Sequence, residues 1–162
     1  MIREVLTSDT EAICEIYNEY ILHSTATFEV EPVTVEEMER RMVEIPLRCP
    51  YLVWTGEGGR VDGYAYAHLW QERAAYGRTW ETTVYVRRGC GGQGIGTALM
   101  GRLIEDCRRA KCHALIACIT AENAESRRLH ERLGFRQVSQ FREVGRKFGR
   151  WLDVTDYELI LN

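Results

Sequence analysis

The feature that most constrains this chain is a glycine-rich segment, residues 84–100, which reads VYVRRGCGGQGIGTALM. Five glycines fall within eight positions, 89–96, between an apolar run typical of a strand and one typical of a helix. Gly94 and Gly96 extend into the predicted helix, where glycine costs up to about 1 kcal/mol relative to alanine. This cost indicates that another molecule approaches the backbone closely. Because free N–H groups at a helix start bind anions, we predict a phosphate or pyrophosphate site here.

Residues 89–94, GCGGQG, also satisfy the pattern G-x-G-x-x-G of dinucleotide-binding loops. That pattern normally lies near the first strand of a parallel sheet, with an acidic residue about 20 positions further on. Here a predicted antiparallel meander precedes the loop, and the strand that follows it ends in Thr120. A P-loop does not fit either, because no Gly-Lys-Ser/Thr sequence follows the glycines. A dinucleotide site is therefore disfavoured.

Hydrophobic periodicity organises the first half of the chain. Residues 2–6 predict a short strand. After them, apolar residues from Ala12 to Ile21 recur at helical spacing, which predicts an amphipathic helix. Thr34 and Glu37 form a capping box ahead of an amphipathic run, which predicts a second helix over 34–46. Residues 23–33 are therefore expected to form a loop between two helices.

The second half of the chain alternates predicted strands and helices. Strands are expected at 51–55, 61–70, 79–86, 113–120, about 135–144 and about 152–161, and helices at about 95–104 and at 123–135, the latter ending at Gly134. The first three of these strands form an antiparallel meander, and a βαβ crossover follows it. We therefore predict an α+β fold with a mixed, mostly antiparallel central sheet flanked by helices.

Length and charge narrow the class of protein. A chain of 162 residues with 45% hydrophobic content fits one domain, residues 1–162. The net charge of −3 favours neither nucleic acid nor an anionic membrane as a partner. No apolar run approaches the roughly 20 residues of a membrane span, and the N-terminus is charged where a signal peptide is apolar. We expect a cytoplasmic protein.

The cysteines do not form a metal-binding pattern. None of the six belongs to a C-x-x-C pair, and four lie within predicted helices or strands. We therefore expect no metal site and no disulfide framework.

The chain resembles the GCN5-related N-acetyltransferase (GNAT) superfamily over nearly its whole length. The loop of that superfamily reads Arg/Gln-x-x-Gly-x-Gly/Ala, and GGQGIG, residues 91–96, matches its last two small positions as Gly94 and Gly96. Gly91 departs from the Arg/Gln of the first position. The resemblance is closest to the phosphinothricin and methionine sulfoximine acetyltransferase branch, and four stretches carry it: STATFEVEPVT (24–34), RAAYGRTWETTVYV (73–86), AENAESRRLHERLGF (121–135) and GRKFGRWLDV (145–154).

This resemblance implies a GNAT fold and an acetyl-CoA site. The expected cofactor-binding residues are those of the loop, of the strand before it, and of the start of the later helix: Gly91, Gly92, Gln93, Gly94, Ile95, Gly96 and Thr97; Val84, Tyr85 and Val86; Asn123 and Ser126. Backbone amides of the loop are expected to dominate, and the strand is expected to pair with the pantetheine arm. Arg87, Arg88 and Arg102 are the candidates for the charge that Gly91 lacks. Asn123 is also a good helix N-cap, and both roles are compatible.

Acetyl transfer to an amine requires removal of a proton from the amine, stabilisation of the developing oxyanion, and tolerance or protonation of the leaving thiolate. The resemblance implies Glu81 as the general base, directly or through water, and His130 as a general acid. The alternative for Glu81 is a solvated carboxylate at a strand end. The alternative for His130 is a structural histidine on an apolar helix face.

The acceptor site is implied by the same branch. Its expected residues are Phe28, Glu29, Arg73 and Tyr76, with Arg78 as a second candidate cation for a carboxylate. Lys147, Phe148 and Trp151 also match the branch, although packing around a turn would equally explain them. The sequence thus predicts an acetyl-CoA-dependent N-acetyltransferase of a small amino-acid-like amine, and relatives of this branch suggest a homodimer. A protein or peptide N-acetyltransferase and a non-catalytic acyl-CoA-binding or dinucleotide-binding module remain alternatives.

Overall fold

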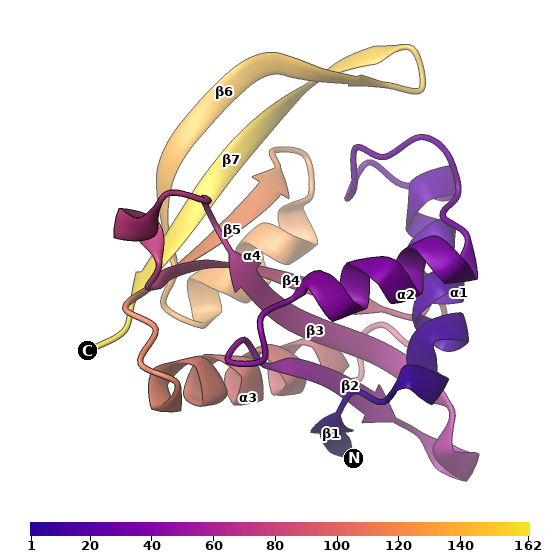
Figure 1. Cartoon of the computed structure of the whole chain (residues 1–162). Coiled ribbons are helices and arrows are strands. Elements are labelled where there is room, and N and C mark those ends of the chain that lie inside the picture. Colours follow the sequence, from indigo (N-terminus) through magenta and orange to yellow (C-terminus); the bar gives the residue numbers. More distant parts are fainter.

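The computed structural model describes residues 1–162 and has one seven-stranded sheet packed between helices (Figure 1). The strands are β1 (Ile2–Glu4), β2 (Tyr51–Thr55), β3 (Val61–Leu69), β4 (Thr79–Val86), β5 (Ala114–Thr120), β6 (Arg136–Lys147) and β7 (Arg150–Ile160). Their order in the sheet is β1-β2-β3-β4-β5-β7-β6. Neighbours β4 and β5 run parallel, and the other five neighbouring pairs are antiparallel. The predicted mixed, mostly antiparallel sheet is confirmed.

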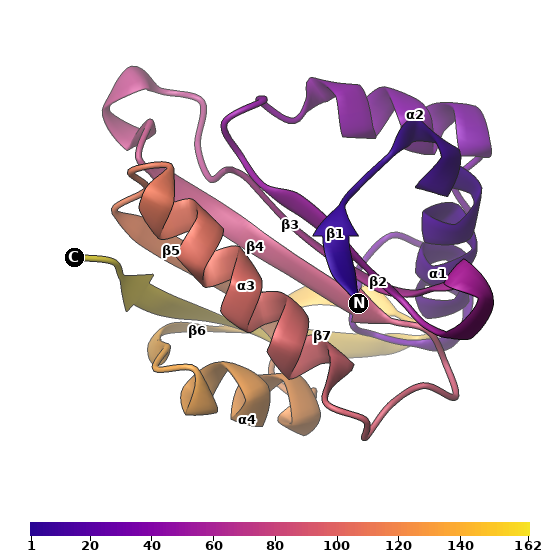
Figure 2. The same cartoon turned by 90° about the horizontal axis from the view of Figure 1, so that it is seen from below.

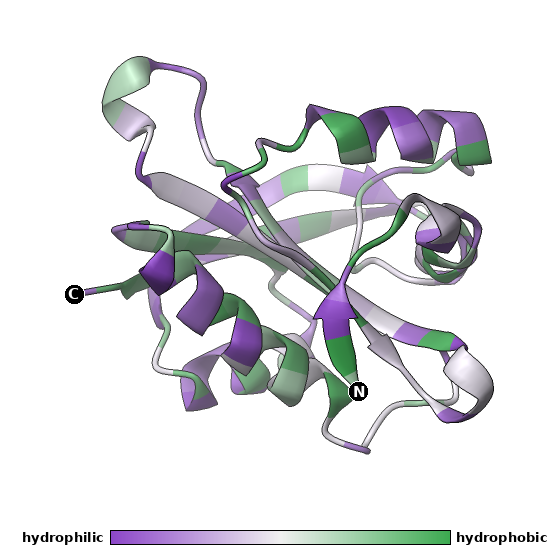
Figure 3. Ribbon diagram, turned by 60° about the horizontal axis from the view of Figure 1, so that its bottom comes forward, coloured by the Kyte–Doolittle hydropathy of each residue, from purple (hydrophilic) through white to green (hydrophobic).

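Four α-helices cover the sheet. They are α1 (Thr10–His23), α2 (Val35–Glu44), α3 (Ile95–Arg109) and α4 (Ala124–Arg132), and short 3-10 turns occur at Thr7–Asp9, Glu57–Gly59 and Ala74–Tyr76. Figure 2 shows α3 and α4 on one side of the sheet and α1 and α2 on the other. Hydrophobic and hydrophilic residues alternate along these helices (Figure 3), as expected for helices that bury one side.

Two hydrophobic cores result, one on each face of the sheet. The larger core joins α3 to the strands through side chains such as Leu99, Leu103 and Trp80. The smaller core joins α1 and α2 to the other face and contains Ile13 and Tyr64. Strand residues alternate between the two faces, so neighbouring positions of one strand serve different cores.

The helix boundaries follow their capping residues. The Thr34 side chain accepts a hydrogen bond from the Glu37 N–H at 3.1 Å, so α2 begins where the capping box predicted. The reciprocal half of the box is absent, because the Glu37 carboxylate pairs instead with Arg40 and Arg41. Two guanidinium partners compete for that carboxylate more strongly than one backbone N–H.

The last two strands differ from the sequence prediction, which ended the first near residue 144 and began the second near 152. They continue to a two-residue turn at Phe148 and Gly149, whose φ angles are +52° and +72°. Positive φ at both positions is typical of a type I′ hairpin. The resulting long hairpin projects beyond the rest of the sheet (Figure 1).

All six cysteines are free thiols, and five of them are buried. No helix combines the length and the apolar composition that crossing a membrane requires.

Candidate functional site

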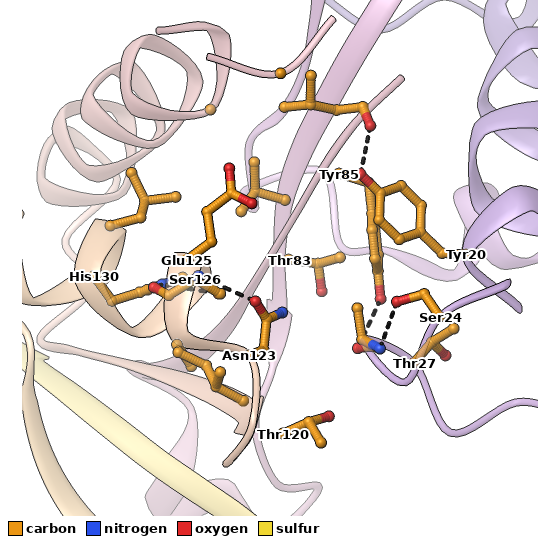
Figure 4. Close-up of a pocket in the computed structure, with 18 of the residues that line it drawn as sticks. Tyr20, Ser24, Thr27, Thr83, Tyr85, Thr120, Asn123, Glu125, Ser126 and His130 are labelled. Carbon is orange, nitrogen blue, oxygen red and sulfur yellow. Dashed lines mark hydrogen bonds between the residues drawn. The ribbon is translucent and has the colours of Figure 1, made fainter. Parts of the chain in front are cut away.

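The main cleft opens where β4 and β5 separate. The two strands pair only from Thr79 to Glu81, opposite Ala114 to Ile116. Beyond Glu81 they diverge and leave a cleft of about 1300 Å³, which is also bounded by the start of α3, by α4 and by the loop after α1. Figure 4 shows the two walls of this cleft, with Thr83 and Tyr85 on one side and Asn123, Ser126 and His130 on the other.

Backbone N–H groups without partners gather at the start of α3. No acceptor in the chain takes the N–H groups of residues 91–97, and the first bond in this stretch is donated by the Ala98 N–H to the Gly94 carbonyl at 3.0 Å. Such a row at the positive end of a helix dipole is suited to an anion. The predicted loop residues all line the cleft except Gln93. Arg87 and Arg88 line it as well.

Positions 94 and 96, at the start of the helix, favour glycine for different physical reasons. Gly94 has a φ of +78°, and a Cβ there would meet open space, so its backbone conformation, rather than a close neighbour, requires glycine. This differs from the sequence interpretation, which gave both glycines one reason. A Cβ on Gly96 would lie 3.6 Å from Val86 and 3.7 Å from Leu129, which belong to opposite walls. A larger side chain at position 96 would therefore project between these two walls.

The edge of β4 that faces the cleft has no strand partner from Thr82 to Val86, because β5 has diverged. Val84, Tyr85 and Val86 all line the cleft along this edge. Opposite them, the Asn123 side chain accepts a hydrogen bond from the Ser126 N–H at 3.2 Å and caps α4.

All three predicted cofactor-site cations have partners within the chain, and that of Arg88 is Glu19 of α1, at 3.8 Å. Arg87 donates to the Val61 carbonyl at 3.0 Å, so it is anchored where it meets the cleft. Arg102 pairs with Asp106 along α3 and does not line the cleft.

Glu81 stands at the point where the strands part. It lies directly opposite His68 of β3, and the His68 Nε2 is 3.4 Å from a Glu81 carboxylate oxygen. Burial lowers the pKa of His68, but the neighbouring Glu81 carboxylate and the Leu69 carbonyl outweigh it and raise that pKa above its ordinary value. The predicted base therefore has a histidine beside it.

His130 is buried on α4 and lines the cleft. Its Nδ1 lies 2.7 Å from the Ser126 carbonyl, and its ring packs edge-on against Phe135. Burial lowers the pKa of His130, and the Ser126 carbonyl opposes this only in part. A neutral ring that donates through Nδ1 presents an acceptor at Nε2. The acid role of His130 stays a prediction, and it requires an added proton at Nε2.

The model of the protein family described as "Acetyltransferase (GNAT) domain" matches residues 2–155 of this chain. The chain belongs to the GNAT acetyltransferase family. Among curated GNAT relatives, it is 40% identical to the L-methionine sulfoximine/L-methionine sulfone acetyltransferase of Salmonella typhimurium, over 96% of this chain and 91% of the relative. It is 38% identical to the phosphinothricin N-acetyltransferase of Streptomyces coelicolor, over 97% and 94%. The predicted family and branch are confirmed.

Solved structures agree with the fold of this GNAT chain. The phosphinothricin acetyltransferase of Sinorhizobium meliloti, in complex with acetyl-CoA, superposes with a TM-score of 0.97 at 35% identity, over 100% of this chain and 88% of that one. The yncA protein of Salmonella typhimurium, with its cofactor acetyl-CoA, superposes with a TM-score of 0.96 at 39% identity, over 100% and 94%.

The predicted acceptor residues of this GNAT domain fall in three places. Phe28 lines the main cleft, and its ring lies so close to Gly145 of β6 that a Cβ there would overlap it. Glu29 lies outside the cleft, where it forms a two-bond ion pair with Arg41 at 2.7 and 2.8 Å and accepts from the Tyr17 hydroxyl. Arg41 first, and then Tyr17, lower the pKa of Glu29 despite its burial.

Arg73 and Tyr76 line a second, smaller hollow of about 670 Å³ after the end of β3. Tyr76 packs edge-on against Trp70 there, with ring centroids 5.4 Å apart. The structure thus does not bring Arg73 together with Glu81 in one cavity of this chain.

Several cleft residues were missed from the sequence. Tyr66 and His68 of β3 line the cleft beside Thr83, and Tyr66 stacks on Tyr51 at 4.7 Å. Counting the antiparallel register from β3 to β4 would have found them, but a long connection of nine residues, 70–78, leaves that register open.

Lys147 makes a structural contact, a role that the sequence alone did not distinguish from contact with the acceptor. It is buried, and its Nζ donates to the Ser24 carbonyl at 2.7 Å and to the Thr27 carbonyl at 2.8 Å. The ammonium group thus ties β6 to the loop that carries Phe28.

Proposed function

We propose that this GNAT chain transfers the acetyl group of acetyl-CoA to the amino group of a small amino-acid-like acceptor, of the phosphinothricin or methionine sulfoximine kind. One observation carries the proposal: a single cleft joins the row of free N–H groups at the start of α3 to the Glu81 carboxylate. An anion site and a base in one continuous cleft suit a phosphate-bearing acyl donor and an amine. The names of the curated relatives support the acceptor class.

The residues present fit acetyl-CoA. The N–H groups of residues 91–97 would hold its pyrophosphate, and the free edge of β4 would pair with its pantetheine arm. The small Gly96 leaves the passage between Val86 and Leu129 open. When bound, acetyl-CoA supplies an activated acetyl thioester.

The other half of the cleft would receive the acceptor. Glu81 takes a proton from the acceptor's ammonium group and so frees the lone pair of its nitrogen. Phe28 and Tyr66 wall the space around it. Arg73 is the proposed partner of the acceptor carboxylate, and its separate hollow makes it the least supported member of the site.

Assembly and location are further proposals. Exposed apolar side chains of the β6–β7 hairpin, Phe141, Val144, Phe148 and Trp151, support a homodimer. Six free cysteines support a reducing compartment, and we propose the cytoplasm.

The test is thiol release from acetyl-CoA by the purified protein, measured against a panel of amino acids and analogues and against peptides with a free N-terminus. We expect phosphinothricin or methionine sulfoximine to be among the best acceptors by kcat/KM. Thiol release with peptides alone would replace the small amino-acid-like acceptor by a peptide. Failure of every amine tested to cause thiol release would contradict catalysis.

A further inference from the structure

A histidine and a carboxylate that both line the cleft face each other across two neighbouring strands. His68 and Glu81 are a directly opposed pair of β3 and β4, 3.4 Å apart between Nε2 and the nearer carboxylate oxygen. The other ring nitrogen of His68, Nδ1, lies 2.9 Å from the Leu69 carbonyl. A carbonyl oxygen only accepts, so Nδ1 carries a hydrogen.

This arrangement fixes what Nε2 can do. In neutral His68 the Nε2 lone pair faces a carboxylate, so two acceptors oppose each other. In protonated His68 the Nε2–H points to that carboxylate and forms an ion pair. One proton between the two groups therefore relieves the repulsion and is held by both.

Resting on the proposed function, we propose that His68 is a positioning residue for Glu81 and that the pair together holds the proton removed from the acceptor's ammonium group. The ammonium N–H bond breaks and its electron pair stays on nitrogen. The proton binds a Glu81 carboxylate oxygen and then passes to the lone pair of His68 Nε2, which restores the carboxylate. Both side chains are about one-third exposed, at 33% and 30%, so the proton leaves to water after each turnover.

The chemistry explains why such a pair is useful. An isolated carboxylate is a weak base toward an ammonium group, whereas a base works best when its pKa lies near the working pH. The pKa of His68 is already raised above its ordinary value in spite of burial. The pair thus binds a proton more tightly than either a lone carboxylate or a buried lone histidine.

The neighbouring titratable side chains do not compete with this pair for the proton. The Tyr66 hydroxyl on β3 and the Cys118 thiol on β5 are neutral near pH 7, because burial first, and then nearby negative charge that includes Glu81, raises the pKa of each. For Cys118 that pKa is about 12. Beyond Tyr66, burial first, and then Tyr66 and Asp9, raises the pKa of the Tyr51 hydroxyl well above its ordinary value, and Glu29 pairs with Arg41.

The first test does not need activity. The imidazoles of the full chain are labelled with ¹⁵N and followed by NMR through a pH titration, in the wild type and in Glu81→Gln. We expect His68 to carry its hydrogen on Nδ1 at high pH and to titrate at a lower pH in Glu81→Gln than in the wild type. A midpoint unmoved by Glu81→Gln, or a hydrogen on Nε2 at high pH, would overturn the pair.

The second test is the pH profile of kcat with both substrates saturating, for His68→Gln against the wild type. Glutamine keeps a polar group but holds no proton, so kcat at pH 8 should fall about tenfold to a hundredfold, less than the roughly 10²–10⁴ of a complete general base. The acid limb should also move to lower pH, since only the carboxylate remains to be protonated.

A matched control separates this effect from the loss of any histidine. His113 is exposed and lies just before β5, so His113→Gln should keep the wild-type profile. A His68→Gln profile that coincides with the wild type would overturn the proposal. An inactive wild type would instead contradict the proposed function, while the NMR titration still decides whether the pair holds a proton.

Discussion

The two halves of the cleft are built from different material. The half proposed for acetyl-CoA relies on backbone groups from residues 82–97: the N–H groups of residues 91–97, of which only Gln93 does not line the cleft, and one strand edge. The half proposed for the acceptor consists of side chains from segments far apart in the chain, among them Phe28, His68, Glu81 and Cys118. A backbone site tolerates most substitutions that keep its conformation, whereas a side-chain site depends on each residue. Mutations in the two halves should therefore have separable effects.

The largest expected effect is that of Glu81→Gln, which removes the proposed base but keeps the shape of the side chain. Turnover should fall by roughly 10²–10⁴-fold, while the Kd of acetyl-CoA stays within a factor of two or three. Steady-state kinetics and calorimetry measure the two quantities. An equal loss in both would mean that the halves are not separable, and unchanged turnover would assign the base elsewhere.

Arg73→Ala tests a proposed acceptor contact that lies outside the cleft, in the second hollow. A lost charge-assisted pair is worth about 1.5 to 3 kcal/mol, so the acceptor KM should rise roughly tenfold to a hundredfold or more with that of acetyl-CoA unchanged. Arg73→Lys should restore only part, because an ammonium group lacks the bidentate fork. If esterifying the acceptor carboxylate weakens wild type and Arg73→Ala equally, Arg78 becomes the candidate.

Gly96→Val tests the cofactor half alone. The added side chain would lie between Val86 and Leu129, where acetyl-CoA is proposed to pass, and a clash with the cofactor of about 1 to 3 kcal/mol should weaken acetyl-CoA binding by roughly 5- to 150-fold. Position 96 is a better choice than Gly94, whose positive φ would add backbone strain to any substitution.

The matched control for this substitution is Gly101→Ala in the middle of α3, where a Cβ meets open space. It should leave acetyl-CoA binding unchanged and stabilise the fold by up to about 1 kcal/mol. Wild-type affinity in Gly96→Val would place acetyl-CoA elsewhere.

The smallest effect concerns Lys147, which joins β6 to the loop that carries Phe28 in the acceptor half. Lys147→Met leaves the Ser24 and Thr27 carbonyls without their donor, at about 1 to 3 kcal/mol of unfolding free energy, partly offset because a buried charge disappears. Denaturant unfolding measures the loss. We also expect a rise of less than tenfold in acceptor KM, because the loop that carries Phe28 loosens. Arg146→Met, at an exposed position whose guanidinium lies over Trp151, should change stability by less than about 1 kcal/mol.

The backbone half of the cleft could be predicted from the sequence because its cause is local. Five glycines between a strand and a helix determine where N–H groups are free, and no distant residue is needed for that. The strand at 79–86 has the predicted bounds, and the Asn123 cap of α4 and the positive φ of Gly134 likewise follow from short-range rules.

The side-chain half was decided by tertiary structure. His68 lies opposite Glu81 only because of the register between β3 and β4. A slip of one residue in that register would turn every side chain of the strand to the opposite face of the sheet. The nine-residue connection does not set that register; burial of the alternate face against α3 does. The bonds of Lys147 to Ser24 and Thr27 span more than 100 positions and depend on the length of a hairpin whose two strands the sequence analysis predicted too short. Local patterns therefore determined the elements and the row of free N–H groups, whereas contacts between distant segments, which exist only once both cores have formed, determined the neighbours of Glu81.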